Sequence, residues 1–282
     1  MNQDDIIYHY TSINTLALIL KHKNIRFNRL DRVDDISEAK AYGKYDLAKY
    51  LFVSCWTDLE KESIPQWHMY TNEMTGVRIS LPKKCFHQRE LQHKPEWGVV
   101  SKTLSPIPLN RIYTDEYIVL TSFLKKDQFQ RKIQYVPNID EVYREAVKLN
   151  ESADGSRVDL RIDEIGKLAS FKNEDWKFQH EFRFVLFIIP SIPIPERGPS
   201  DEVFLENLTR NFFECIKNGK APPIISFDVD LDPDVLDNVV VTLGPLCSEG
   251  DEVIVQALLD RFTNNGRLQK SSLAGKIRKP RS

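Results

Sequence analysis

The sequence lacks most of the features that identify a well-known class of enzyme. It contains no glycine-rich dinucleotide or phosphate loop, no nucleophile elbow and no H-E-x-x-H helix signature. Rossmann, P-loop, serine-hydrolase and zincin functions are therefore not indicated. No apolar run reaches the roughly 18 residues needed to span a bilayer. We therefore expect no membrane segment and no membrane partner.

Cysteine is scarce, and the overall charge is nearly balanced. The four cysteines are scattered without a C-x-x-C pair, and no signal peptide is recognisable, which predicts reduced thiols in a cytoplasmic protein. The net charge of −2 provides no overall field for nucleic acid or an anionic membrane. Cys85, His87 and His93 lie close together, but no fourth ligand is apparent, and we predict no metal site.

Basic residues are concentrated at one end of the chain. Residues 266–282 carry six lysines and arginines and no acid. Such a segment is either a solvated end or an arm that binds RNA or a partner. No composition shift marks an earlier boundary. The sequence therefore predicts one domain over residues 1–265, followed by a flexible basic tail over 266–282.

The most apolar stretch follows a group of polar residues. Phe182–Ile189 is rich in aromatic and β-branched residues and ends at a proline, which predicts a strand over 178–189 buried on both faces. Strand alternation would place Gln179, Glu181 and Arg183 on one face. A buried ionisable group needs a partner, and the simplest structural interpretation is a Glu181–Arg183 ion pair closing a sheet edge.

Shorter patterns predict the remaining elements. We expect further strands at 6–10, 25–28, 51–56, 77–81, 117–123, 132–136, 224–229 and 238–243. We expect helices at 13–23, 37–49, from Pro65 onward, and at 139–149, 160–171, 203–216 and 249–262. Strands outnumber a regular βαβ alternation. The fold class is therefore α+β, a single domain around a split, mainly antiparallel sheet, with 178–189 next to the strand that carries His9.

A set of spaced motifs resembles a bacterial family that is catalogued only as a domain of unknown function. The motifs cover roughly residues 6–245 and are Tyr8-His9-Tyr10-Thr11-Ser12, Leu30-Asp31 to Asp35, Val53-Ser54, Trp67-His68-Met69-Tyr70, Gly76-Val77-Arg78-Ile79, Ile133-Gln134-Tyr135 and Trp176-x-x-Gln179-x-Glu181-Phe182-Arg183. The family's common pattern has Glu where this chain has Gln179. The family name implies no activity by itself.

The same landmarks resemble the ADP-ribosyltransferase fold in its His–Tyr–Glu form. This resemblance implies that His9 binds the adenosine-side ribose of NAD and that the backbone at Tyr10, followed by Thr11, clamps the carboxamide. It also implies that Tyr70 stacks on nicotinamide and that Glu181 is the catalytic carboxylate, with Gln179 where the acceptor arrives. Tyr10 replaces the usual Gly of that fold. Ser54 could instead mark the Arg–Ser–Glu form, which would leave His9 structural.

These resemblances imply an enzyme that transfers ADP-ribose from NAD, its substrate, to a macromolecule without a metal. A neutral amide at Gln179 suits a nucleic-acid base, with RNA favoured, better than an arginine side chain. The class also implies a toxin or anti-phage defence setting with an antitoxin or chaperone partner. The alternative is a non-catalytic protein- or nucleic-acid-binding module on the same fold. A nuclease-like effector is disfavoured because no carboxylate cluster has metal spacing.

Overall fold

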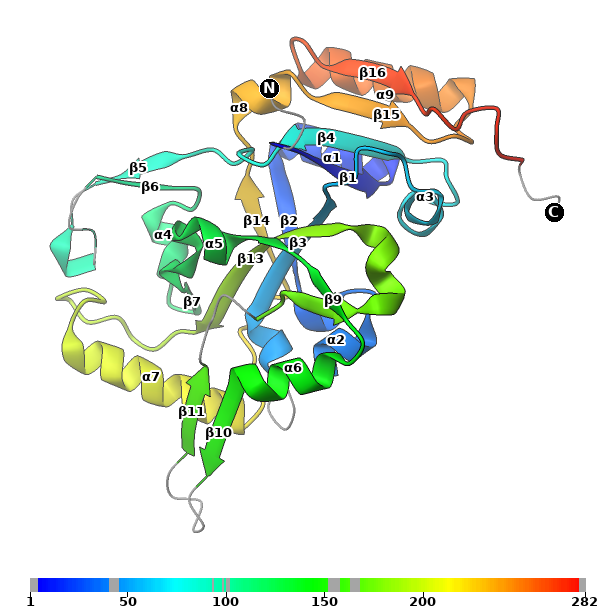
Figure 1. Cartoon of the computed structure of the whole chain (residues 1–282). Coiled ribbons are helices and arrows are strands. Elements are labelled where there is room, and N and C mark those ends of the chain that lie inside the picture. Colours follow the sequence, from blue (N-terminus) through cyan, green and yellow to red (C-terminus); the bar gives the residue numbers. More distant parts are fainter. Residues whose placement is uncertain are drawn as a thin grey trace.

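In the computed structural model of this chain, a ten-stranded sheet is built around strands β3 (Leu51–Thr57) and β13 (Glu181–Pro190) (Figure 1). The structure describes residues 5–40, 46–92, 94–97, 99, 102–151, 158–162 and 168–278. Almost all strand pairs of the described residues are antiparallel, and β15–β16 and β9–β12 are parallel. The α+β class and the mainly antiparallel single-domain sheet are therefore confirmed.

The other elements surround these two strands. The remaining strands of the large sheet are β1 (Ile6–Thr11), β2 (Asn24–Arg29), β4 (Val77–Pro82), β7 (Tyr117–Val119), β8 (Gln130–Lys132), β14 (Ser226–Asp230), β15 (Val240–Leu243) and β16 (Arg267–Lys270). Three two-stranded sheets comprise β5 (Arg89–Leu91) with β6 (Thr103–Ser105), β9 (Gln134–Val136) with β12 (Phe171–Asn173), and β10 (Val147–Glu151) with β11 (Val158–Ile162).

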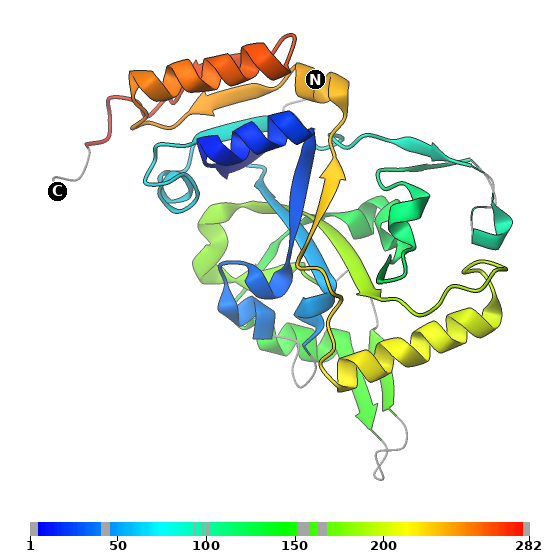
Figure 2. The same ribbon diagram turned by 180° about the vertical axis from the view of Figure 1, so that it is seen from behind.

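Helices lie on both sides of the sheet. The α-helices are α1 (Ile13–His22), α2 (Ile36–Lys40), α3 (Ile64–Tyr70), α4 (Leu109–Ile112), α5 (Lys126–Phe129), α6 (Ile139–Ala146), α7 (Glu202–Lys217), α8 (Pro233–Asp237) and α9 (Glu249–Phe262). Short 3₁₀ turns are η2 (Leu30–Arg32), η3 (Leu47–Tyr50), η4 (Pro95–Trp97), η5 (Thr121–Leu124) and η7 (Glu174–Gln179). Both views show α9 with β15 and β16 at one end of the molecule and α7 at the other (Figures 1 and 2).

Strand β3 is the point at which the sheet splits. One edge of β3 pairs with β13 along its whole length, from Leu51 opposite Phe187 to Thr57 opposite Glu181. The other edge is shared, because β2 pairs with its first half and β1 pairs with its last residue. The expectation that β13 lies next to the His9 strand is therefore wrong, since β3 separates β13 from β1.

Strand β13 separates two hydrophobic clusters. Its even-numbered residues from Phe182 to Ile188 pack in one cluster, and Val185, Phe187 and Ile189 pack in the other. All ten residues of the strand are buried, so the expected burial on both faces is confirmed. Because side chains alternate along a strand, Glu181 and Arg183 lie on the same face as Val185. Two charged groups thus stand at the start of a core strand.

Local structure differs from the sequence-based expectation in several segments. The strand expected over 117–123 ends at Val119, and Thr121–Leu124 is a 3₁₀ turn. The helix expected over 160–171 is wrong, because β11 ends at Ile162 and residues 168–173 form a turn followed by β12; residues 163–167 lie outside the described range. The helix expected over 139–149 ends at Ala146, where β10 follows. In the segment 37–49, α2 ends at Lys40 and Leu47–Tyr50 is a 3₁₀ turn.

The basic end of the chain also differs from the expected flexible tail. Residues Arg267–Lys270 form β16, which pairs in parallel with β15. The side-chain hydroxyl of Ser271 and the backbone amide of Ser272 then donate hydrogen bonds to the Glu62 carboxylate. The sheet therefore continues at least five residues past the expected boundary at 265, to Lys270. The last four residues, 279–282, lie outside the described residues.

Candidate functional site

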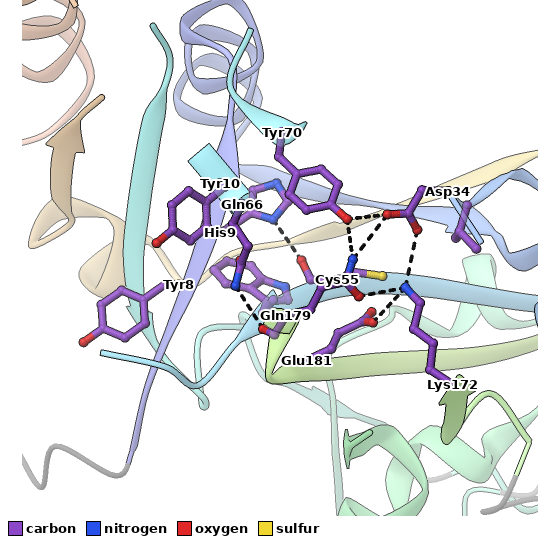
Figure 3. Close-up of a pocket in the computed structure, with 12 residues that line it drawn as sticks. Tyr8, His9, Tyr10, Asp34, Cys55, Gln66, Tyr70, Lys172, Gln179 and Glu181 are labelled. Carbon is purple, nitrogen blue, oxygen red and sulfur yellow. Dashed lines mark hydrogen bonds and ion pairs between the residues drawn. The ribbon is translucent and has the colours of Figure 1, made fainter. Parts of the chain in front are cut away.

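A cavity of about 200 Å³ lies beside the split in the sheet. Its lining residues come from segments far apart in the sequence, and they are Tyr8, His9, Tyr10, Val33, Asp34, Cys55, Trp56, Gln66, Tyr70, Lys172, Gln179 and Glu181 (Figure 3). Five of these are residues that the resemblance assigns to a site: His9, Tyr10, Tyr70, Gln179 and Glu181. The fold brings these five together.

Gln179 and Glu181 reach the cavity by a turn rather than along one strand. Gln179 is the last residue of η7, and His180 has a left-handed backbone with φ of 44°. The His180 carbonyl accepts hydrogen bonds from the Asp58 amide at 3.2 Å and from the Thr57 hydroxyl at 3.2 Å. These bonds hold the turn against the end of β3. The expected strand over 178–189 therefore begins only at Glu181.

Arg183 forms the centre of a buried ion-pair network. Its guanidinium binds the Glu181 carboxylate through Nε at 2.5 Å and Nη2 at 3.1 Å, and it binds Glu38 through Nη1 and, at 2.9 Å, through Nη2. The Arg183 and Glu38 side chains are completely buried. The Glu181–Arg183 ion pair predicted from composition is present. It lies inside the core rather than at a sheet edge.

Lys172 extends this network into the cavity. Its ammonium group donates to Glu181 at 3.3 Å, to the side-chain oxygen of Gln179 at 2.8 Å and to Asp34 at 3.4 Å. It also lies 4.5 Å from the centre of the Trp176 ring, within cation–π range. The network thus contains three carboxyl groups, on Asp34, Glu38 and Glu181, and two cations, and burial raises the pKa of Glu38.

This arrangement keeps Glu181 ionised. Burial alone would raise the pKa of its carboxyl, but the nearby charges of Arg183 and Lys172 outweigh burial and lower the pKa to about 2. Burial would lower the pKa of Lys172, and its carboxylate neighbours, Glu181 first, raise it instead. Glu181 is therefore a carboxylate and Lys172 an ammonium at any physiological pH.

Tyr70 closes one side of the cavity from helix α3. Its hydroxyl donates to Asp34 and accepts from the side-chain nitrogen of Gln179. Burial and the Asp34 carboxylate raise the pKa of Tyr70, so the phenol stays protonated. From the same helix, Gln66 donates to the Gln179 backbone carbonyl at 3.0 Å. Helix α3 is thus bonded to the turn that carries Gln179.

His9 reaches the cavity from strand β1. Its Nδ1 lies 2.9 Å from the Cys55 carbonyl oxygen, which can only accept, so Nδ1 is the protonated nitrogen. Burial lowers the pKa of His9 despite this hydrogen bond, and the imidazole is neutral at pH 7. Its Nε2 is therefore a hydrogen-bond acceptor. The ring also contacts Trp56, with centroids 5.1 Å apart.

The two remaining predicted residues lie elsewhere. Thr11 lines a neighbouring cavity of about 690 Å³, which shares His9, Tyr10 and Tyr70 with the first. The Thr11 carbonyl oxygen would be only 2.3 Å from a Cβ on Gly76, so no larger residue fits at position 76. Ser54 is buried and accepts a hydrogen bond from the Trp56 indole at 3.0 Å. It is not among the lining residues of either cavity, and the structure does not bring it to the site.

Sequence reasoning missed three residues that organise the cavity: Asp34, Gln66 and Lys172. Asp34 lies in the acidic loop and Gln66 in the W-x-x-Y helix, so both stood beside recognised motifs. Lys172 carried no such signal, because it directly follows the helix expected over 160–171 and belongs to no motif. It reaches the site only through the pairing of β12 with β9, which no local pattern predicts.

Comparisons with protein-family models, with curated proteins and with solved structures gave no match. The two resemblances drawn from the sequence therefore stay predictions. Within the described ranges, no group of three or more His, Cys, Asp or Glu side chains could hold a metal ion. His93, one of the three residues considered for zinc, lies outside those ranges. No helix of the described chain has the length and apolar character to cross a membrane.

Proposed function

We propose that this protein cleaves nicotinamide from NAD and transfers the ADP-ribose to a macromolecular acceptor. The observation that carries the proposal is the convergence of His9, Tyr70, Gln179 and Glu181 on one cavity (Figure 3). These residues come from three elements, β1, α3 and β13, and from the η7 turn that precedes β13. They have the residue types that the His–Tyr–Glu resemblance requires.

The charge of the site suits this reaction. When the bond between the ribose C1′ and the nicotinamide nitrogen breaks, its electron pair leaves with nicotinamide, and positive charge develops on the ribose. A nucleophilic atom of the acceptor then bonds to C1′ and loses its proton to solvent. Glu181 is ionised within the ion-pair network and lies at its cavity side. A fixed carboxylate of this kind stabilises developing positive charge more than the neutral ground state of the ribose.

The two neighbouring cavities match the two halves of a dinucleotide. The cavity of about 200 Å³ beside the split in the sheet would hold the nicotinamide ring against Tyr70. The neighbouring cavity of about 690 Å³, which His9 also lines, would hold the adenosine half. The neutral His9 would accept a hydrogen bond from a ribose hydroxyl at Nε2. In this arrangement Glu181 acts on the nicotinamide-side ribose, between the two.

Gln179 gives information about the acceptor. Lys172 donates to the Gln179 side-chain oxygen, so the amide turns its NH₂ group toward Tyr70 and Asp34. An NH₂ group can donate to carbonyl or ring-nitrogen atoms, but it repels a guanidinium. We therefore extend the proposal to a nucleic-acid base, with RNA favoured over arginine. A toxin or defence role with a neutralising protein partner completes the proposed setting.

A second candidate function, a non-catalytic binding module, is favoured by one specific observation. The Glu181 carboxylate already accepts three hydrogen bonds from Arg183 and Lys172. The Cys55 thiol also contributes to lowering the pKa of Glu181 as a hydrogen-bond donor. A carboxylate has about four acceptor positions, so a ribose hydroxyl would have to displace one of these donors. A purely structural network needs no such displacement.

One pair of variants separates the two functions. Glu181→Gln and Glu38→Gln each remove a buried carboxylate from Arg183, but only Glu181 lines the cavity. With both variants folded by circular dichroism, incubation with labelled NAD and cell RNA should show at least about 100-fold loss of transfer for Glu181→Gln. Glu38→Gln should retain most activity. Full activity in Glu181→Gln would refute catalysis. Equal losses would favour the structural network.

A further inference from the structure

The outer face of the sheet, opposite the main hydrophobic cluster, carries a third cavity of about 960 Å³. The outer face consists of two rows of paired residues that cross β1, β4, β15 and β16. The rows are Tyr8–Ser80–Val240–Arg267 and Tyr10–Arg78–Thr242–Gln269. The alternate residues of β4 and β15, such as Ile79 and Val241, point into the core. Figure 3 shows the Tyr8 and Tyr10 rings extending away from Glu181. The outer face thus adjoins the candidate site, whose cavity Tyr8 and Tyr10 also line.

Arg78 is the unusual group on this face. Only 5% of it is exposed, yet it has no ion pair with any carboxylate in the described part of the chain. Its Nη1 donates to the Glu60 carbonyl at 2.8 Å, while its Nε is buried with no hydrogen-bond partner among the described groups. A buried charge without a counter-charge is costly unless something else compensates it. The Tyr8 ring, 4.4 Å from the guanidinium carbon, provides part of that compensation.

Two more cations line the same cavity. Arg267, on β16, and Lys61, in the loop beside the face, are exposed and form no ion pair within the described ranges. Three acids also line the cavity and balance the three cations in formal charge; they belong to the loop that carries Lys61 and to α8, whereas Arg78 and Arg267 are on the strands β4 and β16. One of them, Glu62, is already bonded to Trp67 and Ser272.

We infer that the outer face binds the phosphodiester backbone of a single-stranded nucleic acid. The exposed Lys61 and Arg267, with the nearly buried Arg78 against the Tyr8 ring, match what such strands require: cations for phosphates and a ring on which a base can stack. Four strands at about 4.8 Å spacing give a floor about 14 Å wide, which suits an extended strand. The inference stands whether or not ADP-ribose transfer occurs. Tyr8 lines both cavities, so a bound strand would pass beside the candidate site.

Fluorescence anisotropy with a labelled 12-nucleotide RNA, the full chain and no NAD tests this inference. The double variant Lys61→Ala/Arg267→Ala removes two exposed cations of the outer face and should weaken binding at least about tenfold. Its slope of log K against log salt should become shallower by about 1.4. The matched control Arg210→Ala/Lys217→Ala removes two cations from α7, at the other end of the molecule, and should stay within about twofold of wild type.

Three results would overturn the inference. They are no RNA binding by the wild-type chain, equal weakening in both double variants, and full displacement of the RNA by ADP at concentrations near the RNA affinity. The last result would assign the cavity to a free nucleotide. Because the titration contains no NAD, loss of ADP-ribose transfer in any variant leaves its outcome unaffected, and the two proposals fail separately.

Discussion

Arg183 and Arg78 are almost equally buried, but their surroundings are opposite. Arg183 is fully enclosed and bonded to the carboxylates of Glu38 and Glu181. Arg78 is 5% exposed, and its described neighbours offer a backbone carbonyl and tyrosine rings instead of an ion-pair partner. The first region satisfies its charges internally. The surroundings of Arg78 leave its positive charge for a ligand. The comparison shows that burial of an arginine does not by itself distinguish a structural group from a binding group.

The largest effect should come from breaking the closed network. Arg183→Met leaves Glu38 and Glu181 buried with one fewer cation, and removing one partner of a buried ion pair costs about 3–5 kcal/mol. We expect the free energy of unfolding to fall by about 5 kcal/mol, measured by urea denaturation. A loss of less than about 1 kcal/mol would show that the network contributes little, and the contrast between the two arginines would disappear.

Helix α3 stands between the two regions and allows a second test. Trp67 is completely buried, packs edge-on against Tyr10 at 4.8 Å and bonds to Glu62, whereas Tyr70 faces the cavity. Trp67→Ala should lower the free energy of unfolding by about 3–5 kcal/mol. Tyr70→Ala should cost about 1–2 kcal/mol and strongly reduce NAD turnover. Equal destabilisation by the two changes, measured in urea, would assign Tyr70 to the core.

Acid should weaken the closed network in a defined range. The pKa of Glu181 is lowered to about 2 by Arg183 and Lys172 against the effect of burial, from an ordinary value near 4.5. A lowered carboxyl pKa stabilises the folded state above the unfolded pKa, and this stability is lost as the pH falls from about 4.5 to 2. The shift corresponds to about 3 kcal/mol. Urea titrations across this range should show the loss in wild type, and Glu181→Gln should show a flatter profile.

The smallest effect on stability should come from Arg78. Arg78→Met removes one hydrogen bond and two cation–π contacts, worth about 1 kcal/mol each or less, but it also removes a buried charge without an ion-pair partner among the described residues. These terms oppose each other, so we expect a change in unfolding free energy within about 1 kcal/mol, together with clearly weaker RNA binding. Destabilisation as large as that of Arg183→Met would mean that Arg78 has a structural partner, and the outer face would lose its distinguishing feature.

The parts of the fold that the sequence predicted are those encoded locally. Phe182–Ile189 is apolar except for Arg183, and a strand of this kind is buried wherever it pairs. The helix expected over 13–23 forms as α1, and the Ser12 hydroxyl caps it by accepting from the Thr15 amide. By contrast, β16 reads RLQK and has no strand pattern of its own. It becomes a strand because β15 offers it an edge, which only the tertiary structure reveals.

The candidate site also contains both residues that local sequence predicted and residues that it did not. His9, Tyr70 and Glu181 stood in motifs whose spacing could be compared with a known fold, and they line one cavity. Lys172 and Glu38 stood in no motif and were placed by long-range pairing and helix packing. The turn at His180 could not be predicted either, because a histidine with positive φ leaves no local signature.

The position of β16 has a consequence for the order in which the two regions form during synthesis. All residues that line the small cavity precede Pro190, and the strands β1, β3 and β13 that frame it are complete by then. The outer face lacks a strand until Arg267–Lys270 has been made and has paired with β15. At ribosomal rates of about 5–20 residues per second, the outer face is completed several seconds after the cavity can close. A ribosome that stalls between these points would carry a chain with the residues of the cavity but without Arg267 and Gln269.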